Sequence, residues 1–502
     1  MPKNVADDAL HAAVRAIAED EISSGRELGL QIVAYLHGEK IVDVCAGAVR
    51  LPDGTMRSVT PEVRFMAYSV AKGVSSAIIS RSIESSRGRV KYSDAVSRHW
   101  PDFAAGGKEK ITIAEALSHR AGLRARSLCA LSTIRSMLRG NYDAGMATGI
   151  AWMAASTPSW RSRKYARYHP TSWSWIAGGL YAYLADAHIQ EGAAALAHDL
   201  GVSAEHLRIG ELDPTCWAED LAPMAVPPAS QPFTAWRHAT WHAFASVRGV
   251  RSALWLPMAL AAALFIAIFG WLESVLWVAV ANWSVFLAIC LPSSNGVFTA
   301  RALGGLYGAL ANGGKLTDGT VVLGKAMAAE LRRGAQDSSA DVSGWPDPAR
   351  LTYGFSPWLG GLLEKVLTDR MAATLGVAGS GEKVGRLAIL GHQGMGGCCA
   401  YADMTSGLAI AVLKNAFSPE CINGGGPGRV AVLVDACLRE RFGLVGGTTS
   451  TAGRTEHTTV KPTQRPARSP ARRSSRAEPA AAPRAAVRGT PRKSSPYAAA
   501  RS

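Results

Sequence analysis

Residues 61–123 read PEVRFMAYSVAKGVSSAIISRSIESSRGRVKYSDAVSRHWPDFAAGGKEKITIAEALSHRAGL, and they contain Ser69-Val-Ala-Lys72 at the start of a predicted buried helix that ends near Ser86. Residues three apart share a helix face, so the Lys72 amine can reach the Ser69 hydroxyl and take its proton. The helix N-terminus also favours the negative charge that develops when a serine attacks. The pattern therefore indicates a candidate nucleophile, although an isolated Ser-x-x-Lys string also arises by chance.

Further segments, in a fixed order along the chain, support this interpretation. WPDF (100–103) and LSHRAGL (117–123) follow the serine, and PSSNGVFTARALGGLYGALANGG (292–314) and GHQGMGGCCAYADMTSGLAIAVLKN (391–415) come later. Together they resemble the serine beta-lactamase-related family, in particular its class C-like, family VIII-type carboxylesterase branch. The resemblance spans about residues 10–440. It implies a beta-lactamase-like fold and a metal-independent serine hydrolase with no cofactor.

Strand patterns occur at both ends of the chain. Leu28–Val49 holds two β-branched runs joined by His37-Gly38-Glu39, which is a hairpin signal. Further strands are expected near residues 387–390, 398–402 and 408–413, and outer helices at 6–24 and 430–440. The sequence thus predicts an α+β domain over residues 1–445, with an antiparallel sheet flanked by helices. Residues 125–250 have helical spacing without strand alternation and are expected to form a mostly helical lobe.

The resemblance assigns a tyrosine to the catalytic group. Tyr168, in RYHPTSWSWIAGGLYAYL, is the best match, with Ser69 as nucleophile and Lys72 as the group that holds or accepts its proton. A phenol between two cations can ionise partly and act as a base, because positive charge favours the anion. The identity of the acylation base varies across such enzymes. The Pro-Gly that the family places shortly before the tyrosine is absent here, so Tyr165 is a rival candidate.

The third motif is His392-Gln393-Gly394, where beta-lactamases carry Lys-Thr-Gly. A lysine there would bind a substrate carboxylate, and a histidine would do so poorly, which favours neutral esters. Gly394 would let the strand approach the substrate closely. The resemblance implies that the backbone N–H groups of Met395 and Ser69 form an oxyanion hole. A phosphate-binding loop is disfavoured, because neither a Gly-x-Gly-x-x-Gly spacing nor a Lys-Ser/Thr ending is present.

A hydrophobic insert separates the second and third blocks. Residues 252–291 carry one formal charge, Glu273. The run 252–272 would be about 30 Å long as a helix, close to the thickness of a bilayer core, whereas 275–291 is shorter and interrupted by polar residues. Both flanking blocks must build one active site, so a single membrane crossing is excluded. The options are a hairpin dipping into a bilayer, a monotopic apolar cap, or an insert buried on the protein.

The basic charge is concentrated at the C-terminal end. Residues 446–502 hold twelve Lys and Arg against two Glu, which is +10 of the total net charge of +15. This tail is rich in Pro, Ala, Ser and Arg and poor in large apolar residues, so we expect it to be disordered. Because the excess lies in a tail, no specific nucleic-acid partner is expected.

Cysteine usage and the N-terminus bear on location. The eight cysteines show no Cys-x-x-Cys spacing and are interpreted as reduced thiols, and no zinc motif is present. The first residues lack the apolar core of a signal peptide. We therefore expect a cytoplasmic protein, with membrane association through 252–291 as an option and no bound metal.

The leading hypothesis is a carboxylesterase that acts on small or lipid-like esters through an acyl-serine intermediate. Two alternatives remain open. One is a catalytically silent scaffold of the same fold, and the other is a peptidase or amidase of the same family. The oligomeric state and the natural ester are not specified by the sequence.

Overall fold

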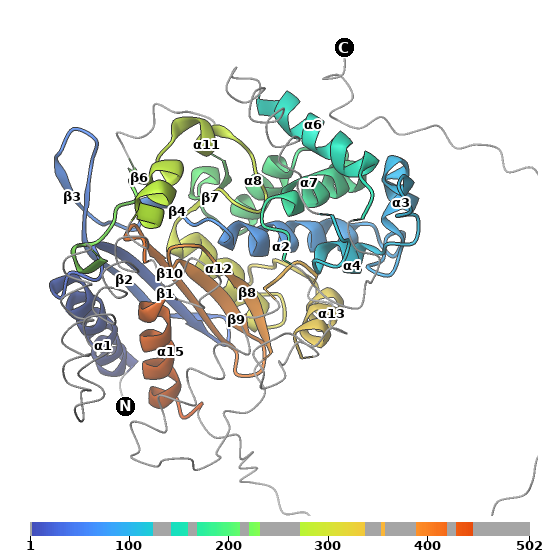
Figure 1. Ribbon diagram of the computed structural model, residues 1–502. Coiled ribbons are helices and arrows are strands. Elements are labelled where there is room, and N and C mark those ends of the chain that lie inside the picture. The colour runs from blue at the N-terminus through green and yellow to red at the C-terminus, as the bar shows by residue number, and fades with distance from the viewer. Residues whose placement is uncertain are drawn as a thin grey trace, which may run out of the picture. The chain divides into compact units, whose positions relative to one another are not determined.

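The structure is a computed structural model that describes residues 3–123, 142–158, 168–210, 220–230, 272–336, 353–356, 388–418 and 428–444 (Figure 1). These residues all belong to one unit, Met1–Gly446 with Ser495–Ser502. The second unit, Gly447–Ser494, holds no described residue. The predicted disordered tail therefore lies outside the described part of the chain.

Both ends of the domain contribute strands to one antiparallel sheet. Its six strands lie in the order β3-β2-β1-β10-β9-β8. Their bounds are β1 Gly29–Leu36, β2 Glu39–Arg50, β3 Met56–Ser58, β8 Ile389–Gln393, β9 Cys399–Asp403 and β10 Leu408–Lys414. The central pair is β1 with β10, in which Leu30 lies opposite Lys414. The predicted α+β architecture is confirmed, because the expected β-branched runs form these strands.

Helices cover both faces of this sheet (Figure 1). Helix α1 (Lys3–Ser23) packs on β2, and α15 (Arg429–Arg441) packs on β10. Side chains alternate along β1, because successive residues of a strand point to opposite faces. Ile32 belongs to the apolar cluster under α1 and α15. Val33 belongs to the larger cluster shared with α12 (Ala300–Ala311) and the remaining helices.

The helical lobe surrounds α2 (Val70–Ser85), the predicted serine-bearing helix. The other described helices of the domain are α3 Val96–His99, η1 Pro101–Ala104, α4 Ile113–Leu117, α6 Tyr142–Ala155, α7 Ser172–Ala185, α8 Ile189–Asp199, η2 Ala204–His206, η4 Pro228–Ser230 and α13 Lys325–Gln336. Most of α2 is buried, including Val70, Val74 and Ile78. The helix is thus an internal element that fixes the position of its own N-terminus.

A second, small sheet lies next to the start of α2. Its order is β5-β7-β4-β6, with bounds β4 Arg64–Met66, β5 Leu207–Ile209, β6 Leu221–Ala222 and β7 Gly296–Phe298. Residues 125–250 were predicted to be mostly helical, and β5 and β6 are two short strands within that range that the prediction did not specify. Strands of two or three residues are too short to show alternation. This sheet matters because β4 leads directly into Ser69.

The described part of the hydrophobic insert comprises residues 272–291. Residues 272–281 are helical, the helix stops at Asn282, and α11 (Ser284–Ala288) follows. Leu287 and Leu291 are buried in the protein, so the run 275–291 is not a continuous membrane-facing leg. The run 252–271 lies outside the described residues. In the described ranges, no helix has both the length and the apolar character needed to cross a membrane.

Candidate active site

Ser69 occupies the N-cap position of α2, directly after β4 and the buried Tyr68. Its side chain makes no capping hydrogen bond to the helix. A serine at the N-cap usually accepts a hydrogen bond from a backbone N–H of the first helical turn, and Ser69 does not. Tyr68 has a positive φ of 46°, a conformation uncommon for residues other than glycine, and this turns the chain sharply into the helix. The hydroxyl is left to interact with side chains around it.

Three predicted residues come together at this hydroxyl. The Lys72 Nζ lies 3.2 Å from the Ser69 Oγ. The Tyr168 hydroxyl donates a hydrogen bond to the same Oγ, at 2.9 Å. Tyr165, the rival tyrosine, lies outside the described residues. The structure thus brings Ser69, Lys72 and Tyr168 within hydrogen-bonding distance, as a nucleophile and two proton-handling groups require.

Lys72 is completely buried, and two backbone carbonyls hold its amine. The Nζ donates to Ser293 O at 2.8 Å and to Pro170 O at 3.1 Å. Burial lowers the pKa of Lys72 well below its usual value. A neutral amine has two N–H donors and one lone pair. In that neutral form the two carbonyls accept both donors, and the lone pair is left to accept from the Ser69 O–H.

The pKa of the Tyr168 phenol is shifted in the direction opposite to the one expected from the sequence. Burial raises the pKa of its phenol, and the hydrogen bond to Ser69 offsets only part of that effect. The ionised phenol expected from two neighbouring cations also requires a charged Lys72, whose pKa is lowered. The two pKa shifts therefore favour Lys72 as the proton acceptor and Tyr168 as a neutral donor. The sequence could not show this, because burial in the fold determines the pKa shifts of both Lys72 and Tyr168.

His392 lies at the end of β8, with its ring centroid 6.1 Å from that of Tyr168. Its Nδ1 is 2.6 Å from the Gln393 carbonyl oxygen, which can only accept, so Nδ1 carries the proton. Burial is the main cause that lowers the pKa of His392 to about 3. The ring is thus neutral, and its Nε2 is a hydrogen-bond acceptor with no partner among the described residues. Such a group repels a carboxylate.

Gly394 begins the turn that joins β8 to β9. A Cβ atom there would lie 2.2 Å from the Ala67 carbonyl oxygen, so only glycine fits. The sequence predicted a close approach of this strand to the substrate, whereas the close contact in the structure is with Ala67, two residues before Ser69. It brings the turn containing Met395 against the start of α2. Neither the Ser69 nor the Met395 backbone N–H donates to another backbone group within the described ranges, which suits the oxyanion role that the resemblance implies.

Several residues that support the site had weaker sequence signals. The His119 Nδ1 accepts from the His169 N–H at 3.2 Å, and the His169 Nε2 accepts from the Leu123 N–H at 3.1 Å. These bonds tie the LSHRAGL string to the segment carrying Tyr168. The Ser293 hydroxyl also donates to Pro170 O at 2.8 Å. His119, in the LSHRAGL string, could be found from sequence, whereas the carbonyls of Pro170 and Ser293 could not.

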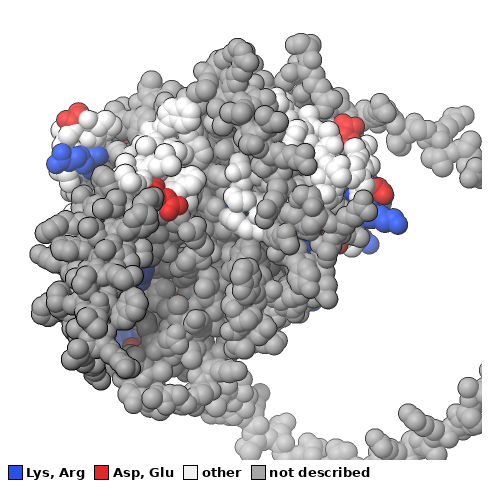
Figure 2. Space-filling model, in the orientation of Figure 1, with Lys and Arg blue, Asp and Glu red and all other residues white. Residues whose placement is uncertain are grey.

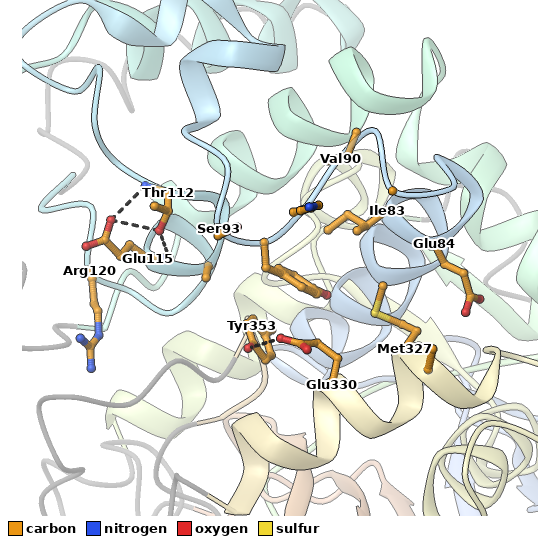
Figure 3. Close-up of a pocket in the computed structure, with 15 residues that line it drawn as sticks. Ile83, Glu84, Val90, Ser93, Thr112, Glu115, Arg120, Met327, Glu330 and Tyr353 are labelled. Carbon is orange, nitrogen blue, oxygen red and sulfur yellow. Dashed lines mark hydrogen bonds between the residues drawn. The ribbon is translucent and has the colours of Figure 1, made fainter. Parts of the chain in front are cut away.

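A separate cavity of about 750 Å³ lies near the other end of α2 (Figure 3). Tyr92 and Tyr353 line it with ring centroids 4.2 Å apart, and Glu330 accepts from the Tyr353 hydroxyl at 2.9 Å. None of the predicted site residues lines it. Within the described ranges, no cluster of three His, Cys, Asp or Glu side chains could hold a metal ion.

Comparison with known proteins agrees with the fold. Residues 12–193 match the beta-lactamase family model. The chain is 27% identical over 420 residues to the esterase/beta-lactamase LipL of Mycobacterium tuberculosis strain H37Rv, covering 82% of each protein. Solved structures with the same fold include a family VIII carboxylesterase (TM-score 0.58) and a penicillin-binding protein homologue from Caulobacter crescentus (TM-score 0.57). Each is 23% identical and is matched over 86% of this chain and 97% of its own.

The fold, the serine-bearing helix and the family match define the class as serine hydrolases. Within that class, the chain is similar to beta-lactamase-related enzymes, through the family match over residues 12–193 and the 27% identity to LipL.

Proposed function

We propose that this enzyme is a carboxylesterase that cleaves neutral small or lipid-like esters through an acyl intermediate on Ser69. The observation that carries the proposal is that one hydroxyl, the Ser69 Oγ, contacts both Lys72 and Tyr168. LipL, the relative reported above, is described as an esterase/beta-lactamase, which is consistent with this choice.

The proposed acylation begins when the Ser69 Oγ attacks the ester carbonyl carbon and its proton moves to the neutral Lys72 amine. The carbonyl becomes a tetrahedral oxyanion, which the N–H groups of Ser69 and Met395 stabilise. Collapse of this intermediate breaks the bond between the acyl carbon and the alkoxy oxygen. The Tyr168 hydroxyl passes a proton to that leaving oxygen, and the protonated Lys72 amine returns a proton to Tyr168. Water then attacks the acyl-serine by the reverse proton path and releases the acid.

His392 supports a neutral substrate. Its unprotonated Nε2 offers a lone pair where a lysine would offer a positive charge, so a substrate carboxylate would face repulsion instead of an ion pair. This disfavours peptidase activity on substrates with a terminal carboxylate, and beta-lactams for the same reason. The intact contacts at Ser69 argue against a catalytically silent scaffold.

Labelling with a fluorophosphonate probe tests the proposal. The native enzyme should be labelled at Ser69 and should hydrolyse a neutral p-nitrophenyl ester faster than a carboxylate-bearing ester of similar size. Ser69→Ala should lose the label and about 10⁶-fold in rate, as removal of a nucleophile does in a serine protease. Ser80→Ala, a buried serine of the same helix, is the control and should keep both. Unchanged hydrolysis by Ser69→Ala, or a preference for the carboxylate-bearing ester, would contradict the proposal.

A further inference from the structure

The described part of the insert exposes a group of large apolar side chains. Leu272, Val275 and Leu276 are 49%, 39% and 61% exposed, and Trp283 is 42% exposed. The first three lie at i, i+3 and i+4, and so share one side of the helix 272–281. We call these four residues the apolar ridge. In the space-filling view, the described surface around α11 is mostly uncharged, with acidic atoms beside it (Figure 2).

The apolar ridge is a concentration, not a chance scatter. In the described part of the chain, seven large hydrophobic residues are markedly exposed, and four of them form the ridge. The other three, Met56, Val321 and Phe442, lie on separate elements. Scattered exposed apolar residues are ordinary on a protein surface, whereas a contiguous group marks an interaction site.

The other side of the helix is firmly attached to the domain. The Asn282 side chain accepts from the Met224 N–H at 2.9 Å and donates to the Met224 carbonyl at 2.8 Å. The Tyr68 hydroxyl donates to the Trp277 carbonyl at 2.6 Å. Ser274 and Ala281 are buried. These contacts hold the ridge outward in a defined orientation.

The same contacts place the ridge close to the candidate active site. Tyr68 immediately precedes Ser69, and its ring joins the apolar cluster that includes Ala281, with Trp277 and Met395 packed against it. The helix that carries the ridge therefore rests on the segment that presents the nucleophile. Whatever binds the ridge lies near the serine.

We propose that the apolar ridge docks this enzyme on the surface of a phospholipid membrane. The chain that leads into the ridge supports a lipid partner, because residues 252–271 have no charged side chain and end at Trp271, one residue before Leu272. Leucine and valine on one side of a helix, with tryptophan near its ends, are typical of helices that lie in a membrane interface. Docking would let lipid esters reach Ser69 from the membrane, a consequence that rests on the proposed esterase function, although the docking itself does not.

Co-sedimentation of the full-length protein with phosphatidylcholine vesicles tests the docking. The native protein should pellet with the vesicles, and the double variant Leu272→Glu/Leu276→Glu should bind at least about tenfold more weakly, because charged groups partition poorly into the apolar layer. Met56→Glu is the matched control, since Met56 and Leu276 are both 61% exposed. It should bind as the native protein does. All three proteins should hydrolyse a water-soluble ester at the same rate.

Three outcomes would overturn the docking proposal. They are failure of the native protein to bind vesicles, equal binding by the double variant, and a native dimer that the double variant converts to monomer. The last would show that a second copy of the chain covers the ridge. None of them bears on Ser69, so loss of docking and loss of esterase activity are separate results.

Discussion

Replacing Lys72 by methionine should abolish activity and yet stabilise the protein at neutral pH. The Lys72 amine is buried, and burial lowers its pKa well below the usual value, which favours the neutral amine in the folded protein. In the unfolded chain the same amine binds a proton up to a pKa of about 10.4. Between the two pKa values the unfolded state holds more protons, and the free energy of unfolding therefore rises with pH.

The size of the effect follows from that difference. Each pH unit below about 10.4 at which the folded amine stays neutral costs about 1.4 kcal/mol of stability. Methionine has no such cost, but it loses the three hydrogen bonds that Lys72 makes to Ser69, Pro170 and Ser293, at about 1 kcal/mol each. The two terms balance about two pH units below 10.4. We therefore expect the variant to be the more stable protein below about pH 8 and the less stable one above it.

Urea unfolding of both proteins from about pH 6 to about pH 9, followed by tryptophan fluorescence, measures this difference. Lys108→Met is the control, because burial lowers the pKa of Lys108 only to about 8. Its stability difference from the native protein should stay constant below about pH 8 and change only above that value. A difference for Lys72→Met that does not vary with pH would show that the folded amine is protonated, and the neutral base would be refuted.

Two further substitutions test the site directly. Tyr168→Phe removes the hydrogen bond to Ser69 and should lower kcat/KM by about 10²–10⁴-fold with the circular dichroism spectrum unchanged; full activity would redirect attention to Tyr165. Gly394→Ala places a Cβ 2.2 Å from the Ala67 carbonyl, so it should lower the free energy of unfolding by about 1–3 kcal/mol and impair ester hydrolysis. Gly305→Ala, whose Cβ would meet only Leu200 at 3.4 Å, should do neither, and equal effects of the two changes would contradict the packing argument.

The parts of this fold that sequence could predict are those with a repeating pattern or a fixed string. The β-branched runs gave the sheet, and Ser69-x-x-Lys72 and His392-x-Gly394 marked two sides of the site. Distant segments, such as the one carrying Tyr168, were found only through family resemblance. Spacing alone cannot place a tyrosine against a serine 99 positions away.

What could not be predicted depends on burial and on backbone groups. The charge state of Lys72 follows from its enclosure and from the carbonyls of Pro170 and Ser293, and any residue supplies a carbonyl. Asn282 is another example. As a polar residue it suggested an interrupted membrane run, but its side chain clamps the helix 272–281 to Met224. The structural role of a polar residue in an apolar run therefore depends on its hydrogen-bond partner, which the sequence does not identify.

The central pairing of β1 with β10 has a consequence for how the protein is made. The Gly29 N–H donates to the Asn415 side chain, a partner 386 positions later in the chain. At about 5–20 residues per second, synthesis leaves β1 without that neighbour for roughly 20–80 s. Throughout that time the β1–β2 hairpin has an open hydrogen-bonding edge on which other chains can pair. Yield in the cell should therefore depend on how well that nascent edge is shielded.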